Sequence, residues 1–419
     1  MLTTKKKMIL FGAAVAVALV VLIVLLIVFL LPKATTTGKN TSSLSSVLGQ
    51  EESSTSDDSS TDSAIDSSGT VPGQSSMALN SAVSSRPGTP NGNTSKNEQV
   101  SSSKAPSKPS TSSAPSNSKT FSILSDPKFE SGFNVLGLNA GDGGAAGKFV
   151  YNPLDIVGRQ YWNLAQWWTK YSFADKNYTQ QKKLGNNVYG LINKNKEFII
   201  DYNTNTLTFK GITSNLYEAP RQDGENWFHL LIEQNFVTAN TKITDLAKVQ
   251  VTMSNRLTYF KDNMGDAFNS GLHAAQFLMY FTVTNRDPNS PENGKYIWFG
   301  FPMFDNRFEW NPATSMLDKG TGSLMVIIGN EVMYKANGKN NCWKNGKVYA
   351  SPNAEWSYFS LDVLPMIKNA LDTAHKDGYL TKTSLDQLYI TGMNLGWEIP
   401  GSYDATMEVK DFSIIGTRK

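Results

Sequence analysis

The sequence is poor in cysteine, and its charges are close to balanced. Cys342 is the only cysteine among 419 residues, which excludes an intrachain disulfide. A large domain can fold outside the cell without one if its core is big enough. No base neighbours this thiol in the sequence, so we predict an unreactive, buried side chain. A net charge of +3 gives no basic signature, so nucleic acid is not expected as a partner.

Histidine is also scarce, which bears on metal binding. The three histidines, His229, His273 and His375, are too few and too scattered for a metal cluster. No His-Glu-x-x-His motif occurs either. We therefore predict no metal and no cofactor. A structural calcium is the one exception, since Asn139 and Asp142 could help to bind it, but one carboxylate is weak support.

Residues 8–31 form a long apolar run without a charged side chain. A helix of this length crosses the roughly 30 Å hydrocarbon core of a bilayer. Lys5, Lys6 and Lys7 precede the run and only Lys33 follows closely. The positive-inside rule then predicts a single-pass protein of the cell membrane with a cytoplasmic tip, 1–7, an anchor, 8–32, and an extracellular remainder. A cleaved signal peptide is the alternative, but its apolar region usually runs only about 7–15 residues.

Residues 33–120 contain mainly Ser, Thr, Gly, Pro, Asn and Asp. A segment of this composition cannot bury enough apolar surface to offset the entropy of ordering its backbone. We predict a disordered stalk that holds the following domain away from the membrane.

Residues 121–419 show alternating apolar and polar positions between Gly, Asn, Asp and Pro turns, which is typical of β-strands. The clearest strands are 206–211, 227–236, 248–257, 274–285, 296–307, 324–328, 388–397 and 405–415. One good helix follows Asp362, with Pro365 in its first turn and Gly378 at its end. A weaker helical pattern covers 164–170. We predict one all-β domain, a two-sheet antiparallel jelly-roll sandwich with one docked helix.

Several runs in this domain resemble a known superfamily. They are Trp-Phe-His-Leu-Leu-Ile-Glu-Gln at 227–234, Ala-Gln-Phe at 275–277, the run 298–307, Gly-Trp-Glu-Ile-Pro-Gly at 396–401, and 407–413. These runs are similar to strands of the concanavalin A-like lectins and glucanases, as found in bacterial membrane-anchored secreted proteins. The resemblance implies a sandwich whose concave face holds a glycan. It does not imply which chemistry, if any, takes place there.

Whether the domain is an enzyme stays open. Glucanases of this shape usually carry Glu-x-Asp-x-Glu on one strand, and no such triplet occurs here. Polysaccharide lyases of the fold use Arg, His or Gln, and Tyr. The catalytic candidates on that pattern are Arg221, His229, Gln276 and Tyr280, although a lone histidine is more often structural.

Aromatic and polar residues supply the binding candidates. Trp167 and Trp168 are adjacent and cannot both point inward from a regular strand, so one is free to stack on a sugar. The candidate substrate-binding residues are Trp167, Tyr217, Glu233, Asp305 and Arg307. We predict a carbohydrate-binding protein that recognises a polysaccharide or cell-wall glycan. The alternatives are a polysaccharide lyase or glycoside hydrolase of the same fold, and a cell-surface structural or protein-interaction module.

Overall fold

In this computed structural model the described residues are 119–139, 148–217, 219–236, 241–318, 320–335 and 339–419. All of them lie in the compact unit Ser67–Lys419. The predicted tip, anchor and nearly all of the predicted stalk, as well as Asp142, fall outside the described residues. No helix in the described ranges is both long enough and apolar enough to cross a bilayer.

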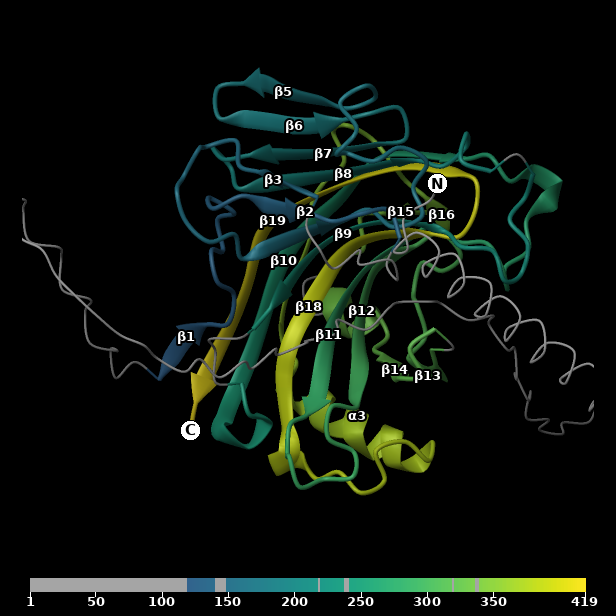
Figure 1. Cartoon of the computed structure of the whole chain (residues 1–419). Coiled ribbons are helices and arrows are strands. Elements are labelled where there is room, and N and C mark those ends of the chain that lie inside the picture. The colour runs from purple at the N-terminus through teal and green to yellow at the C-terminus, as the bar shows by residue number, and fades with distance from the viewer. Residues whose placement is uncertain (1–118, 140–147, 218, 237–240, 319, 336–338) are drawn as a thin grey trace, which may run out of the picture. The chain divides into compact units, whose positions relative to one another are not determined.

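Two large sheets pack face to face, which confirms the predicted mainly β sandwich (Figure 1). The first sheet contains β1 (Thr120–Ser122), β5 (Gln180–Gly185), β6 (Val188–Ile192), β7 (Lys196–Asp201), β8 (Thr206–Ile212), β10 (Leu246–Asp262), β17 (Ser357–Asp362) and β19 (Tyr403–Arg418). Its order is β17–β10–β19–β8–β7–β6–β5, with β1 also paired to β19.

The second sheet has nine strands. They are β2 (Phe133–Val135), β3 (Phe149–Tyr151), β4 (Trp162–Ala165), β9 (Phe228–Asn235), β11 (Gln276–Asn285), β12 (Tyr296–Asp305), β13 (Thr314–Leu317), β14 (Leu324–Ile327) and β18 (Leu388–Ile399). The order is β13–β14–β12–β11–β18–β9–β4–β2–β3. Two pairs, β12–β14 and β2–β4, are parallel, so the prediction of purely antiparallel sheets is wrong at these points.

All eight predicted strands are present. The predicted alternation along β11 is confirmed, because Phe277, Met279 and Phe281 lie in the core between the sheets and Gln276 and Tyr280 lie on the opposite face. The predicted weak helix at 164–170 is wrong. Its first residues belong to β4, because Leu164 and Ala165 pair with β9.

Aromatic side chains from both sheets meet in the core. Phe277 of β11 packs edge-to-face on Phe209 of β8 and on Trp397 of β18. The Trp397 indole also donates a hydrogen bond of 2.9 Å to the Phe209 carbonyl oxygen. This bond joins the two sheets and satisfies a polar group that would be costly to bury alone.

The docked helix is α3 (Leu364–Lys376), as predicted. Pro365 lies in its first turn, and the Asp362 carboxylate accepts a hydrogen bond of 3.2 Å from the Leu364 N–H. Gly378 follows the helix at a φ of +74°, a conformation that glycine adopts easily. The helix packs against β10, β12 and β14.

The remaining described elements are short. They are α2 (Glu331–Tyr334), the 3₁₀ helices η1 (Ile243–Asp245), η2 (Gly265–Ala267) and η4 (Leu385–Gln387), and the pair β15 (Trp343–Lys344) and β16 (Lys347–Val348).

The longest strands bend along their length. Figure 1 shows β18 and β19 curving together, with β19 on the outside of the bend and β18 on the inside. The nine-stranded sheet, which contains β18, therefore has its outer face on the concave side.

Candidate functional site

Polar side chains cross the outer face of the nine-stranded sheet in two rows. The first polar row consists of Asp305, Gln276, Glu398 and His229, which are successive cross-strand partners on β12, β11, β18 and β9. The second polar row lies four residues along the strands. It consists of Tyr280, Asn394, Glu233, Asn163 and Asn134 on β11, β18, β9, β4 and β2.

Between the two rows lie side chains that are apolar or absent. They are Leu278, Gly396, Leu231 and Ala165, again in register across four strands. Gly396 has a φ of +153°, and a Cβ at this position would lie 2.1 Å from the Leu230 carbonyl oxygen. Only glycine fits here, so this part of the face has no side chain over β18.

One end of the first polar row is fixed by an ion pair. Arg307 donates from Nη2 to Asp305 Oδ2 at 2.7 Å and from Nε to Oδ1 at 2.9 Å. Burial works against the charge of this guanidinium, but the hydrogen bonds to Asp305 prevail and raise the pKa of Arg307. Gln276 donates from Nε2 to Asp305 Oδ2 at 2.8 Å. The predicted polar pair therefore exists, and it orients Gln276.

The other end of the row brings an imidazole to a carboxyl group. His229 and Glu398 are each 1% exposed, and Nε2 lies 3.7 Å from Oε2. Burial lowers the pKa of His229 to about 4. Burial also raises the pKa of Glu398 to about 7, although the Trp227 indole opposes this.

The lowered pKa of His229 leaves its imidazole neutral near pH 7, whereas a pKa of about 7 means that Glu398 is present there in both forms. His229 Nδ1 lies 2.9 Å from the Trp227 carbonyl oxygen, which can only accept, so Nδ1 carries the ring proton. His229 Nε2 is then a bare acceptor facing Glu398. Neither Nε2 nor Oε2 has a hydrogen-bond partner in the described part of the chain.

The second polar row also buries a carboxyl group. Glu233 is 2% exposed, and burial raises its pKa to about 8. Within the described ranges, Glu233 Oε2 and Asn394 Oδ1 have no hydrogen-bond partner. Asn134 and Asn163, joined by a hydrogen bond of 3.4 Å, are half-buried and continue the row toward the edge strand β3. Buried polar atoms without partners are rare in folded proteins, and a ligand or a water molecule can supply the missing bonds.

A stack of flat side chains stands beside His229. The Trp227 ring lies nearly parallel to the imidazole at 5.5 Å, and Trp167 meets it edge-on at 5.8 Å. Arg221 lies 4.9 Å over the Trp227 ring and donates to the backbone oxygens of Glu225 and Leu272. The Arg221 guanidinium is therefore held by backbone oxygens of the segments before β9 and β11.

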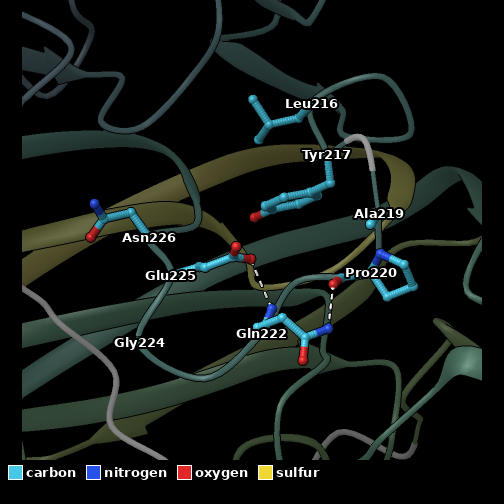
Figure 2. Close-up of a pocket in the computed structure, with 8 residues that line it drawn as sticks. All are labelled: Leu216, Tyr217, Ala219, Pro220, Gln222, Gly224, Glu225 and Asn226. Atoms are coloured by element: carbon cyan, nitrogen blue, oxygen red, sulfur yellow. Dashed lines mark hydrogen bonds between the residues drawn. The ribbon is translucent and has the colours of Figure 1, made fainter.

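A pocket of about 580 Å³ lies in this loop (Figure 2). It is lined by Leu216, Tyr217, Ala219, Pro220, Gln222, Gly224, Glu225 and Asn226. Figure 2 shows Gln222 bound to the Glu225 carboxylate and to the Pro220 carbonyl oxygen. Tyr217 donates to the Ile399 carbonyl oxygen at 3.4 Å, next to Glu398 in β18. None of the lining residues belongs to the two polar rows.

The structure brings most of the predicted site residues together. Gln276, His229 and Asp305 lie in the first polar row, with Arg307 bound to Asp305, and Glu233 and Tyr280 lie in the second. Trp167 and Arg221 belong to the stack beside His229, while Tyr217 lines the separate pocket. Their roles stay predictions.

Sequence reasoning missed Glu398 and Asn394. The predicted strand 388–397 ended one residue before Glu398, whereas β18 continues to Ile399. The alternation of a strand could have assigned them, because Asn394, Gly396 and Glu398 are two residues apart and therefore lie on the same face of β18.

The described residues contain no group of three or more His, Cys, Asp or Glu side chains suited to a metal ion. Asn139 lies beside the undescribed segment that holds Asp142, so the predicted calcium site stays untested.

Comparison with known proteins finds fold neighbours only at low similarity. No family model matches the chain, and no curated protein sequence matches it. Solved structures similar to it include the endoglucanase Cel12A from Rhodothermus marinus, with 10% identity, a TM-score of 0.29, and coverage of 57% of this chain and 97% of that one. A family 12 xyloglucanase from Bacillus licheniformis has 8% identity, a TM-score of 0.31, and coverage of 57% and 97%. Endoglucanase 3 of Trichoderma harzianum, from glycoside hydrolase family 12, has 7% identity, a TM-score of 0.27, and coverage of 58% and 95%. At this level of similarity the neighbours support no conclusion about the activity of this chain.

Proposed function

We propose that the chain binds a polysaccharide on the outer face of its nine-stranded sheet. One observation carries the proposal: two cross-strand rows of amide, carboxyl and imidazole groups, several of them with unpartnered buried atoms, lie on the concave side of the bend. Sugar hydroxyl groups donate and accept hydrogen bonds, and so they can satisfy these atoms. The apolar strip between the rows suits the C–H faces of a sugar ring.

The aromatic side chains support the same proposal. Trp167 stands at the His229 end of the first polar row, and we propose that its ring packs on a sugar there. Asn134 and Asn163 are half-buried and lie near the β3 edge of the sheet, and we propose that the glycan enters there.

A glycoside hydrolase is the second candidate function. It is favoured by the raised pKa values of Glu398, about 7, and Glu233, about 8, because a general acid must hold its proton near neutral pH. A lyase has less support. Burial raises the pKa of Tyr280 well above its usual value, and Arg221 is bound to backbone oxygens.

We also propose that residues 8–32 anchor the protein in the cell membrane, with the sandwich outside the cell. This part of the proposal rests on the apolar run and on the lysines before it. Protease accessibility of an epitope at the C-terminus in intact cells tests it, and protection of that epitope would contradict it.

Binding is tested by affinity electrophoresis of the full-length chain in gels that contain wall and plant polysaccharides. We expect retardation by at least one of them. Asn394→Ala removes an amide from the second polar row, and we expect it to weaken retention about tenfold, the effect of roughly 1.4 kcal/mol. Thr208→Ala, on the outer face of the other sheet, is the matched control and should bind like the wild type. Absence of retention by every polysaccharide would favour a structural or protein-interaction role instead.

A further inference from the structure

Gln276 and Glu398 are direct cross-strand partners on β11 and β18. Side chains in such positions have Cβ atoms about 4.5–5.5 Å apart. Retaining cleavage of a glycosidic bond uses two carboxyl groups about 5–5.5 Å apart, one as acid/base and one as nucleophile. If two side chains of equal length project in parallel from such positions, their ends keep a similar separation. A carboxyl group at position 276 would then stand near the Glu398 carboxyl group, and an amide occupies that place.

We infer that Gln276 and Glu398 form the reacting pair of a retaining glycosidase-type site in which Gln276 replaces the nucleophile, so that a bound glycan lies across the pair uncut. This inference rests on the proposed function, because it assumes that a glycan reaches this face. The glycan's glycosidic bond would lie between the two side chains, with Glu398 on the side of the leaving oxygen.

The neighbours of the pair support this assignment. Asp305 accepts from the Gln276 amide and is itself held by Arg307, so the side chain at 276 has a fixed orientation. His229 Nε2 lies 3.7 Å from Glu398 Oε2, near the carboxyl group but without a hydrogen bond to it. The side chain at 276 is thus oriented by a further group, as reacting side chains generally are.

A second amide–carboxyl pair on the same face provides a comparison. Asn394 and Glu233 are also direct cross-strand partners. Their row neighbours are Tyr280 and Asn163, so the second pair has no ion pair beside it. We therefore assign Asn394 and Glu233 to binding alone.

The decisive experiment introduces a carboxylate at position 276 of the full-length chain. In Gln276→Glu the new carboxylate attacks the anomeric carbon, the glycosidic C–O bond breaks, and the proton of Glu398 passes to the leaving oxygen. Water then attacks the anomeric carbon, Glu398 takes a proton from it, and the bond to the introduced carboxylate breaks. The net reaction is hydrolysis with retention of configuration.

We expect Gln276→Glu to hydrolyse the polysaccharide that retards the wild type at least about 100-fold faster than the wild type does, measured as reducing ends. Gln250→Glu, the same amide-to-acid substitution on the outer face of the eight-stranded sheet, is the matched control and should bind and remain inactive like the wild type. Adding Glu398→Gln to Gln276→Glu should abolish the gain. A Gln276→Glu protein that still binds and does not cleave overturns the inference, and so does a wild type that cleaves. If the wild type binds no polysaccharide, the proposed function fails as well.

A smaller substitution covers the case in which Gln276→Glu does not fold. Gln276→Ala leaves space for azide. Azide can attack the anomeric carbon of a 2,4-dinitrophenyl glycoside made from the sugar of the polysaccharide that the wild type binds. The C–O bond to the aryl group breaks, and its electron pair leaves with dinitrophenolate. We expect azide-dependent release by Gln276→Ala and none by the wild type. A folded Gln276→Ala protein that azide does not activate contradicts the inference.

Discussion

Glu233 gives the most direct prediction about stability, because its carboxyl group is buried without an ionic partner among the described residues. Burial raises its pKa from 4.5 to about 8 in the folded protein. Between these values the unfolded chain has released the proton and the folded protein still binds it. With respect to this group, the free energy of unfolding is therefore highest below about pH 4.5. It falls as the pH rises toward 8, by up to about 1.4 kcal/mol per pH unit.

The change to test is Glu233→Gln, which keeps the shape and removes the ionisation. The two pKa values imply that Glu233 lowers the wild-type free energy of unfolding by about 3 to 4 kcal/mol between pH 5 and pH 8. We therefore expect the difference in the free energy of unfolding, Glu233→Gln minus wild type, to increase by about 3 to 4 kcal/mol from pH 5 to pH 8. Other titrating groups act in both proteins and cancel in the difference.

The assay is guanidinium unfolding at fixed pH values from 5 to 8, followed by the fluorescence of the nine tryptophans. Glu355→Gln, at an exposed position, is the matched control and should show a flat difference. A flat difference for Glu233→Gln would refute the reasoning, because it would mean that Glu233 is ionised in the folded protein.

Three further predictions concern single side chains. Gly396→Ala should lower the free energy of unfolding by at least about 3 kcal/mol, because its Cβ would lie 2.1 Å from the Leu230 carbonyl oxygen. A smaller loss, measured by guanidinium unfolding, would contradict the described backbone. Arg307→Ala should cost about 3 to 5 kcal/mol in the same assay, since it leaves Asp305 buried and unpaired, and a cost below about 1 kcal/mol would contradict that. Cys342, whose pKa burial raises to about 12, should not react with a thiol reagent at pH 8 until the protein is unfolded, and rapid labelling of the native protein would count against its burial.

The sandwich could be predicted from the sequence because apolar side chains alternate along its main strands. Phe277, Met279 and Phe281 repeat every second residue, and this period places them all in the core. The parallel pair β12–β14 could not be foreseen, because strand order depends on long-range packing that no local pattern encodes.

The candidate site was predictable only in part for a related reason. Residues such as Gln276 and Tyr280 could be assigned to one face of β11 by their parity. Their cross-strand partners Glu398 and Asn394 depend on the register between β11 and β18, which the sequence of neither strand specifies. Burial of Lys196, whose pKa is lowered well below its usual value, follows likewise from tertiary packing against Phe173.

Binding of a glycan to the outer face of the nine-stranded sheet is tested by comparing the retention of Asn394→Ala, Thr208→Ala and the wild type in gels that contain the polysaccharide bound by the wild type. We expect about tenfold weaker retention of Asn394→Ala alone. Equal retention of all three proteins would contradict binding at this face.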